Sequence, residues 1–327
     1  MYSQFEQAPV LVIGGLGFIG SNLARKLVDV GARVAVIDAM LPNCGGRLFN
    51  VAGYENQIEI HLVDLARPEG LESILAGKSY IFNVAGRVSH LDSMTHPIAD
   101  LDANVLAQIN LLEACRRHAP NATIVYASTR QIYGKPIRLP VNEDHPLRPV
   151  DVNGVNKMAG EAYHTLYHDV YGLRCVALRM TNTFGPRMRV KDARQTFLGV
   201  WLRAIIENRP FEVWGGQQLR DFSYIDDAVS ACLAAAVCPQ AWGRAFNIGG
   251  SPPISLLELA DRLVMIAGDA RYDLREFPPE RKAIDIGDYY ADDSRFRELT
   301  GWRAEVSLDE GLARAIDYYR QNLRAYV

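Results

Sequence analysis

Three glycines follow the first apolar run of the sequence at a spacing that can hold a dinucleotide. The run Val10 to Ile13 leads into Gly14, Gly17 and Gly20, and a helical pattern begins at Phe18. The first glycine of such a turn permits a tight bend, the second lets the backbone approach a pyrophosphate, and the third lets the helix pack on the strand. The amide groups and the dipole at the helix N-terminus attract phosphates. These residues predict a dinucleotide site.

A carboxylate extends this predicted site. Asp38 follows the second apolar run, Val34 to Ile37, where an acidic side chain accepts hydrogen bonds from the hydroxyls of an adenosine ribose. The same charge repels a 2′-phosphate, which favours NAD over NADP. The segment 83–86 should line the cofactor trough, and the residues after the third run should contact adenine. The further cofactor residues expected on this basis are Phe18, Ile19, Asp64, Leu65 and Ala85.

Apolar runs of strand length alternate with longer helical patterns through the first half of the chain, which is typical of βαβ units. The runs show little polar alternation, as expected for parallel strands buried on both faces. We therefore expect an α/β fold with a Rossmann-type, doubly wound parallel sheet. The expected strands are Val10 to Ile13, Val34 to Ile37, Ile58 to Val63, Tyr80 to Val84, Ile124 to Ala127 and Cys175 to Leu178, and the clearest helices are Phe18 to Val30, Asp100 to His118 and Gly154 to Tyr171.

The regular alternation ends after Arg179. Loops rich in Arg, Gly and Pro follow, with a short strand at Phe211 to Trp214 and helices at Leu256 to Ile266 and Leu308 to Arg324. One late strand, Phe246 to Ile248, looks like a return to the large sheet. We expect a nucleotide-binding domain of residues 1–180 plus about 225–249, and a smaller, mostly C-terminal α/β lobe of about 181–224 plus 250–327. Ligands of open α/β sheets bind at the carboxyl edge of the strands.

Composition limits the partners. The 327 residues carry a net charge of -3 at pH 7 with dispersed Lys and Arg, so no basic stripe is present and nucleic acid is not expected. No apolar run approaches the ~20 residues that span a bilayer, and the first residues lack a leader pattern, so we expect a cytoplasmic protein without membrane contact. The 5 cysteines include no CxxC pair and indicate buried thiols. No metal site is predicted.

Further motifs lie along the whole chain. They are Tyr126-Ala127-Ser128-Thr129, Ile132-Tyr133-Gly134, Leu178-Arg179 with Asn182, Phe184-Gly185-Pro186, the segment 220–227 and Phe246-Asn247-Ile248-Gly249. With the glycine turn and Asp38, they make the chain resemble the extended short-chain dehydrogenase/reductases, specifically the NAD-dependent sugar-nucleotide epimerase/dehydratase family, of which UDP-glucose 4-epimerase is typical. The resemblance implies that NAD stays bound, takes a hydride from the sugar and commonly returns it.

The resemblance also implies the catalytic residues. A Ser or Thr hydroxyl at the end of the fifth strand bonds the sugar hydroxyl that is oxidised, and Thr129 occupies that position. A tyrosine acts as the base, and a lysine four residues later holds the nicotinamide ribose. Lys157 is present, but Asn153 stands in the tyrosine position. An amide cannot ionise at accessible pH, so the usual acid/base mechanism needs a substitute.

Three interpretations of this substitution remain open. In the first, the sugar is still oxidised and the proton passes to Asp151, His90 or Tyr133, or to water held by Thr129 and Asn153. In the second, NAD is structural and the chemistry needs no hydride transfer, as in a redox-neutral lyase or dehydratase. In the third, the protein binds a sugar nucleotide without catalysis. We favour the first, because the family's hydroxyl and lysine accompany an intact cofactor site that a binding module does not need.

The candidate acceptors have simpler explanations too. Packing is the more frequent role for a residue such as Tyr133, and His90 and Asp151 fit surface or loop positions. Arg130 and Gln131 follow Thr129, where dehydratases of the family carry acids. Neither an arginine nor an amide donates a proton easily, so simple dehydration is disfavoured.

The substrate side follows from charge. A nucleotide diphosphate brings at least two negative charges, and arginines match phosphate oxygens with planar forked donors. We expect a nucleotide-diphosphate sugar as the ligand and assign it Ser89, Arg130, Asn182, Arg220 and Arg281. Arg130 is also placed to bond a carboxylate or hydroxyl of the sugar, or to form a salt bridge between the lobes.

The family commonly dimerises through a four-helix bundle. The helices Asp100 to His118 and Gly154 to Tyr171 are therefore expected to pair with their copies in a homodimer. Apolar residues recur on them at helical spacing. These residues are Leu101, Val105, Ile109, Leu112, Ala162 and Leu166.

Overall fold

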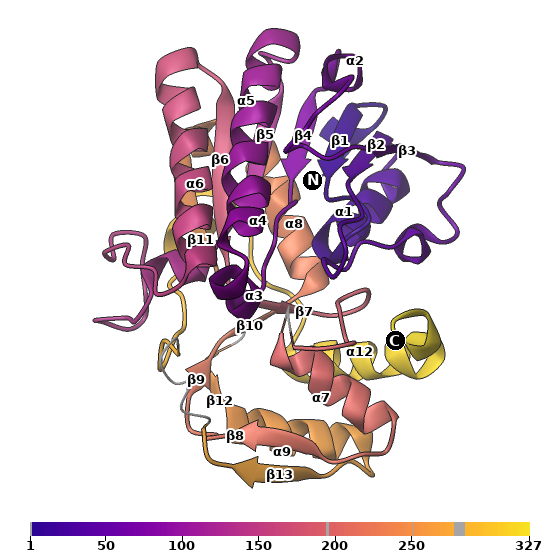
Figure 1. The fold of residues 1–327 in the computed structure, drawn as a ribbon, viewed down its shortest axis with the longest axis vertical. Helices are drawn as coiled ribbons and strands as arrows, with labels where there is room; N and C mark the ends of the chain where they lie inside the picture. Colours follow the sequence, from indigo (N-terminus) through magenta and orange to yellow (C-terminus); the bar gives the residue numbers. More distant parts are fainter. Residues whose placement is uncertain (1, 194–195, 251, 278–284) are drawn as a thin grey trace.

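A parallel sheet of seven strands forms the upper half of the molecule (Figure 1). The computed structural model describes residues 2–193, 196–250, 252–277 and 285–327. Along the sheet the strands follow the order β11-β6-β5-β4-β1-β2-β3, so the order reverses between β1 and β4. The strands are β1 (Pro9–Ile13), β2 (Arg33–Asp38), β3 (Ile58–Leu62), β4 (Tyr80–Asn83), β5 (Thr123–Thr129), β6 (Arg174–Met180) and β11 (Arg244–Ile248).

This sheet confirms the expected fold class, a doubly wound α/β architecture. Each expected strand begins and ends within two residues of the observed one, because the apolar runs are buried on both faces and are bounded by turns. β11 pairs in parallel with β6, with Phe246 opposite Leu178. The late strand therefore returns to the large sheet. The reversal between β1 and β4 opens a crevice at their carboxyl ends, where ligands of such sheets bind.

Helices cover both faces of the sheet because neighbouring strand residues point to opposite sides. On β1, Val10 and Val12 pack in one core with α1 (Phe18–Asp29) and α8 (Ile225–Ala236). Leu11 and Ile13 pack in a second core on the other face. That face carries α2 (Leu71–Leu75), α5 (Ala107–His118) and α6 (Val152–Tyr171), and α5 and α6 run side by side (Figure 1).

The helix expected over Asp100 to His118 is interrupted. It consists of α4 (Pro97–Leu101), a π-helical turn (Asp102–Leu106) and α5. The spacing of apolar residues cannot reveal this single wide turn. A buried polar cluster stabilises the turn, in which Asn104 Nδ2 donates a hydrogen bond to Asp100 Oδ1 at 3.0 Å. Such π turns are frequent near functional sites. The short α3 (His90–Thr95) precedes α4.

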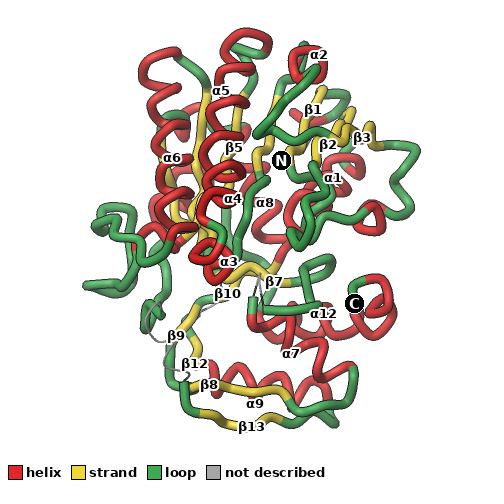
Figure 2. Tube along the Cα trace, in the orientation of Figure 1, coloured by secondary structure: helices red, strands yellow, loops and turns green. Residues whose placement is uncertain are grey.

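A smaller lobe lies below the sheet in Figure 1. Its strands form three pairs: β7 with β10, β9 with β12, and β8 with β13. Loops and the short β7 and β10 connect it to the sheet (Figure 2). Its elements are β7 (Asn182–Phe184), α7 (Phe197–Ile206), β8 (Phe211–Trp214), β9 (Leu219–Arg220), β10 (Phe222–Tyr224), β12 (Ile254–Ser255), α9 (Leu256–Ala267), β13 (Tyr272–Arg275) and α12 (Leu308–Asn322). The helix α11 (Ser294–Thr300) packs on β11 of the large sheet instead.

The two lobes share one hydrophobic core. The cluster that contains Val10 and Leu23 beside the sheet continues without a break through Ala228 to Trp201 and Leu312 in the smaller lobe. The division near residue 180 that we expected from the sequence stays a prediction.

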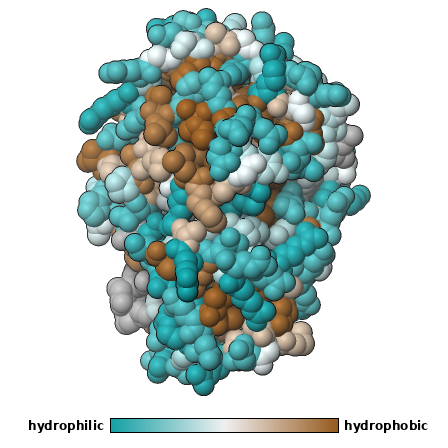
Figure 3. Space-filling view, turned by 90° about the vertical axis from the view of Figure 1, so that its right-hand side faces the viewer, coloured by the Kyte–Doolittle hydropathy of each residue, from teal (hydrophilic) through white to brown (hydrophobic). Residues whose placement is uncertain are grey.

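The face drawn in Figure 3 is mostly hydrophilic, and hydrophobic side chains gather in its upper half and in a smaller group lower down. Among the described residues, no helix is both long enough and apolar enough to cross a bilayer.

Candidate functional site

The glycine turn lies at the reversal of the sheet order, between β1 and α1. Gly14 has φ +78°, which favours glycine, and a Cβ on Gly20 would come within 2.1 Å of Gly14 O. Gly17 is the N-cap of α1 and, among the described residues, no side chain bonds the first amides of this helix. These amides and the helix dipole are therefore open to the phosphates of a dinucleotide.

Asp38 is held beside this turn at the end of β2. Its Oδ2 accepts a hydrogen bond from Leu16 N at 3.0 Å, and its Oδ1 accepts one from Met40 N at 2.8 Å. Burial raises the pKa of Asp38, and the backbone N–H donors lower it in part. Backbone groups therefore fix the orientation of the carboxylate. Its oxygens can still accept a hydrogen bond from a ribose hydroxyl.

A cavity of about 140 Å³ follows the turn along the crevice. The loop after β3 forms its far wall, where Asn110 Nδ2 holds Leu65 O at 2.8 Å. The sequence analysis did not single out Asn110, which comes from a helix distant in the chain. The expected cofactor residues that line this cavity are Gly14, Gly17, Phe18, Ile19, Gly20, Asp38, Asp64, Leu65 and Ala85.

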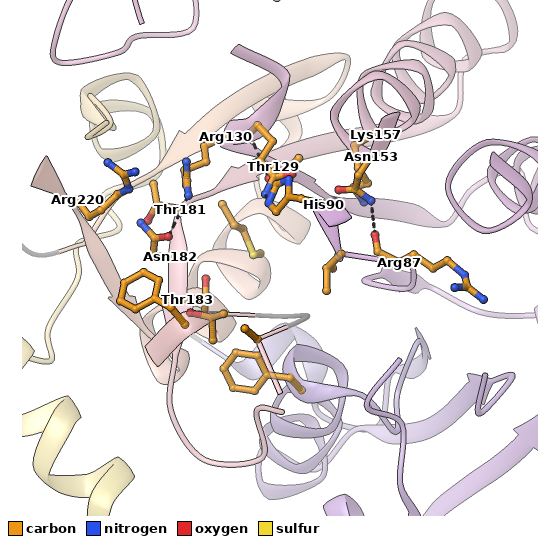
Figure 4. Close-up of a pocket in the computed structure, with 18 of the residues that line it drawn as sticks. Arg87, His90, Thr129, Arg130, Asn153, Lys157, Thr181, Asn182, Thr183 and Arg220 are labelled. Carbon is orange, nitrogen blue, oxygen red and sulfur yellow. Dashed lines mark hydrogen bonds between the residues drawn. The ribbon is translucent and has the colours of Figure 1, made fainter. Parts of the chain in front are cut away.

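A larger cavity of about 370 Å³ continues from the first and shares Phe18, Ile19 and Ala85 with it. It lies between the carboxyl ends of β4, β5 and β6 and the smaller lobe. The expected site residues that line it are Thr129, Asn153, Lys157, Arg130, Asn182 and Arg220. Figure 4 shows Asn153 and Lys157 at one end, Thr129 and His90 in the middle, and Arg130, Asn182 and Arg220 toward the other end.

Of the expected substrate residues that the structure describes, Ser89 is not part of this wall. Ser89 does not line the larger cavity, because its hydroxyl caps α3 and accepts a hydrogen bond from Asp92 N at 3.2 Å. It borders a small neighbouring cavity instead. Arg281 lies outside the described residues.

Lys157 lies one turn into α6, with its ammonium beneath the end of β5. Its Nζ donates to Ala127 O at 2.6 Å and lies 4.3 Å from the ring centre of Tyr126. Burial lowers the pKa of Lys157 to about 8, while the carboxylates of Asp100 and Glu161 raise it in part. The cation is thus fixed at the junction of the two cavities, where it can donate to a ribose hydroxyl.

Asn153 is buried in the first turn of α6. Its Nδ2 donates to Arg87 O at 2.7 Å and to Asp100 Oδ2 at 3.0 Å. Asp100 also accepts hydrogen bonds from Asn104 and from Asn156 Nδ2, the latter at 2.9 Å. Both amide hydrogens of Asn153 are therefore used in tying α6 to α4 and to the loop after β4. We did not predict this network, although an acid and an amide four residues apart on one helix are a detectable signal.

A histidine and an aspartate meet beside this network. His90 Nδ1 lies 2.5 Å from Asp151 Oδ2, and Asp151 Oδ1 accepts a hydrogen bond from Gly154 N at 2.7 Å as the N-cap of α6. The side chain of Asp151 is 3% exposed and that of His90 is 36% exposed. We expected surface or loop residues, and Asp151 does lie in the loop that ends at α6, but it is buried there because the imidazole covers its carboxylate. His90 lines the larger cavity.

Tyr133 has the packing role that we considered more frequent. It is fully buried, donates a hydrogen bond to Asn247 Oδ1 at 2.7 Å and accepts one from Arg179 at 2.7 Å. Burial raises the pKa of Tyr133 to about 12, although Arg179 lowers it in part. Because it does not line the larger cavity, Tyr133 is poorly placed to accept a proton from a ligand there.

Two arginines, Arg130 and Arg220, line the opposite end of the larger cavity. Arg130 donates to Asn182 Oδ1 at 3.1 Å, and within the described ranges no carboxylate lies at ion-pair distance from its guanidinium. A salt bridge between the lobes is therefore not its role there. Arg220 pairs with Asp285 at 3.2 Å, and burial lowers the pKa of Arg220 to about 10. Both arginines stay protonated near neutral pH and suit an anionic ligand.

The fold and the glycine turn define a Rossmann-type dinucleotide-binding protein, in which a second, larger cavity adjoins the cofactor trough. The sequence model of the NAD dependent epimerase/dehydratase family matches residues 10–249. The chain belongs to this family, and its cofactor is NAD. The open amides of α1, the close approach at Gly20 and the fixed carboxylate of Asp38 fit that cofactor.

Individual relatives cover the chain almost completely. The UDP-glucose 4-epimerase of Mycolicibacterium smegmatis is 30% identical over 95% of this chain and 98% of its own. The structure of UDP-N-acetylglucosamine 4-epimerase from Methanobrevibacter ruminantium in complex with UDP-N-acetylmuramic acid is 25% identical over 97% and 99% of the two chains, with a TM-score of 0.89. UDP-glucuronic acid 4-epimerase from Bacillus cereus, in complex with UDP-glucuronic acid and NAD, is 27% identical over 96% and 99%, with a TM-score of 0.86.

Proposed function

We propose that this protein epimerises a nucleotide-diphosphate sugar through transient oxidation of the sugar, with a group other than tyrosine as the base. One observation carries the proposal: Thr129 and Lys157 both line the larger cavity, which shares Phe18, Ile19 and Ala85 with the cofactor trough. A sugar hydroxyl beside Thr129 would face the reactive end of the dinucleotide. NAD, when bound, would accept a hydride from the sugar carbon and return it.

The chain's own residues would hold the reactants in place. The Thr129 hydroxyl would donate a hydrogen bond to the sugar oxygen, since its own oxygen already accepts one from Gln131 N at 3.3 Å. The Lys157 ammonium, fixed by Ala127 O, would bond the ribose of the cofactor and stabilise negative charge that develops nearby. Arg130, Asn182 and Arg220 would receive the sugar and its diphosphate.

The burial of Lys157 supports catalysis over binding alone. A buried ammonium is costly to desolvate, and its lowered pKa is a direct sign of that cost. Perturbed groups of this kind concentrate at catalytic sites. Dehydration is disfavoured because Arg130 and Gln131 occupy the cavity wall after Thr129, and neither supplies an acid.

The named relatives support a UDP-sugar as the substrate class. The two solved structures hold UDP-sugars whose sugar parts carry a carboxylate. In this chain Arg130 is the cavity cation closest in sequence to Thr129, and it has no ion-pair partner among the described residues. A sugar carboxylate or hydroxyl bonded to Arg130 would complete its coordination.

A panel of UDP-sugars tests the proposed function. Purified protein should release NAD on denaturation and convert at least one of UDP-glucose, UDP-N-acetylglucosamine and UDP-glucuronic acid to an epimer, as followed by NMR. A transient NADH absorbance should appear on mixing in rapid kinetics. If calorimetry finds saturable binding of these nucleotides while none of them is converted, the protein is a sugar-nucleotide binding protein and the proposal fails.

We also propose a homodimer through the outward faces of α4, α5 and α6. Leu101 and Leu166 are exposed, as the expected stripe requires, whereas Leu112 is fully buried within the chain and belongs to its own core. Light scattering should therefore give twice the chain mass. Leu166→Glu should shift the protein to a monomer, because a charge at the centre of an apolar interface is costly. The matched control Met265→Glu, exposed on α9, should leave the mass unchanged, and a monomeric parent protein would refute the dimer.

A further inference from the structure

The imidazole of His90 is presented to the larger cavity in a defined orientation. Its Nδ1 contacts the carboxylate of Asp151 at 2.5 Å. Asp151 is itself fixed, because its other oxygen caps α6 through Gly154 N at 2.7 Å. Burial raises the pKa of Asp151, but His90, the backbone N–H of Gly154 and the charge of Arg130 together lower it by more, so the carboxylate stays ionised. An ionised acceptor at Nδ1 makes that nitrogen the N–H donor of the neutral ring.

The other ring nitrogen is then the basic one, and its lone pair accepts a hydrogen bond from the side-chain amide of Gln131, which a substrate hydroxyl would have to replace. With the proton on Nδ1, the lone pair of Nε2 points away from Asp151. Nε2 contacts the side-chain amide of Gln131, and the backbone N–H of the same Gln131 bonds the Thr129 hydroxyl. One residue therefore connects the imidazole with the hydroxyl that would hold the sugar. His90, Gln131 and Thr129 line the same cavity, and Figure 4 draws His90 and Thr129 in the middle of its wall.

The residue in the usual tyrosine position does not compete for this role. The amide hydrogens of Asn153 are bonded to Arg87 O and Asp100 Oδ2. An amide has no proton-accepting nitrogen. Tyr133 is bonded to Asn247 and Arg179 away from the cavity. Of the candidate acceptors, only His90 combines a cavity position with a basic lone pair.

We propose that His90 is the proton acceptor of the reaction and that Asp151 is its positioning residue. The inference rests on the proposed function. As the sugar carbinol is oxidised to a ketone, the O–H bond breaks and its proton goes to His90 Nε2, while the hydride from the same carbon reduces the nicotinamide dinucleotide. On the return step the hydride re-forms the C–H bond from the other face, and His90 gives its proton back to the oxygen. Asp151 stabilises the imidazolium formed in between.

Chemical rescue tests the role of His90. His90→Ala should lower kcat for the UDP-sugar that the panel shows to be converted by about 10²–10⁴-fold. NAD content and the calorimetric Kd for UDP should change little. Added imidazole should restore part of the rate in a saturable manner. His90→Gln fills the site and blocks rescue, and His118→Ala, exposed at the end of α5, should keep the full rate.

A double-mutant cycle tests Asp151. Asp151→Asn keeps the helix cap, because asparagine caps as well as aspartate, yet it should lower kcat roughly 10-fold or more by losing the oriented tautomer. In the His90→Ala background the same change should have almost no further effect on kcat. A purely structural role would give additive losses instead.

The outcomes separate the two proposals. If the parent protein converts a UDP-sugar and His90→Ala keeps kcat within about 3-fold, the dyad proposal is wrong and the proposed function stands. Additive losses in the cycle overturn the role of Asp151. If the parent protein converts none of the nucleotides, the proposed function fails and the dyad proposal falls with it.

Discussion

Replacing Lys157 by methionine is expected to lower kcat by about 10²–10³-fold, the loss typical of removing one fixed donor from an active site. Methionine keeps the length and apolar stem of the side chain but removes the ammonium that donates to Ala127 O at 2.6 Å. The loss should appear mainly in kcat, because we propose that UDP binds at the far end of the cavity, beside Arg130 and Arg220. Steady-state kinetics and calorimetric UDP binding measure the two effects separately.

The pH profile gives this prediction a second readout. Burial lowers the pKa of Lys157 to about 8. The positive charge is therefore present below pH 8 and lost above it, so kcat of the parent protein should decline as the pH rises through about 8. The methionine variant should lack this decline. Lys135→Met, a change at an exposed lysine, serves as the control. A Lys157→Met variant with the parental kcat would remove Lys157 from the mechanism.

The second large effect concerns stability. Arg179→Met should lower the free energy of unfolding by about 3–5 kcal/mol, the usual result of breaking a buried ion pair. The Arg179 and Glu161 side chains are 8% and 7% exposed and lie 2.5 Å apart. Ser128 Oγ also donates to Glu161, at 2.6 Å. The variant would leave the Glu161 carboxylate buried without its cation. Urea unfolding followed by circular dichroism measures the change.

A surface pair is the matched control for this loss. Arg297 pairs with Asp293 at 2.7 Å, but its side chain is 38% exposed. Arg297→Met should therefore cost only about 0–1 kcal/mol. Changing Glu161 to leucine together with Arg179→Met should recover much of the stability, since the uncompensated charge is then removed. A loss below about 1 kcal/mol for Arg179→Met alone would show that the carboxylate finds another partner.

The parts of the molecule that the sequence predicted well depend on local spacing. The glycine turn, the position of Asp38 and each large strand are encoded by residues that are neighbours in the sequence. The apolar runs can therefore be recognised without knowing which distant segments they contact. Thr129 and Lys157 were placed by the resemblance to a family, and the structure brings both to one cavity. Their assigned roles stay predictions.

The parts that were missed depend on contacts between distant segments. His90 and Asp151 are separated by 61 residues, and only the packing of α3 against α6 brings them together. The same holds for Asn153, which reaches Asp100 across 53 residues. Ser89 is a different case, because a serine before a helix with an acid three residues later is a local capping pattern. We assigned Ser89 to the substrate instead, although this local pattern matches the observed hydrogen bond from Asp92 N.

The continuous core has a consequence for how substrate preference can change. Because one hydrophobic cluster runs from the sheet through α8 to α7 and α12, the smaller lobe is not a separable module that could be exchanged for that of a relative. A transplanted lobe would need to match the packing of the whole shared core. New preferences should therefore arise by replacement of single side chains at the cavity rim, such as Arg130 or Arg220, while the cofactor half stays intact.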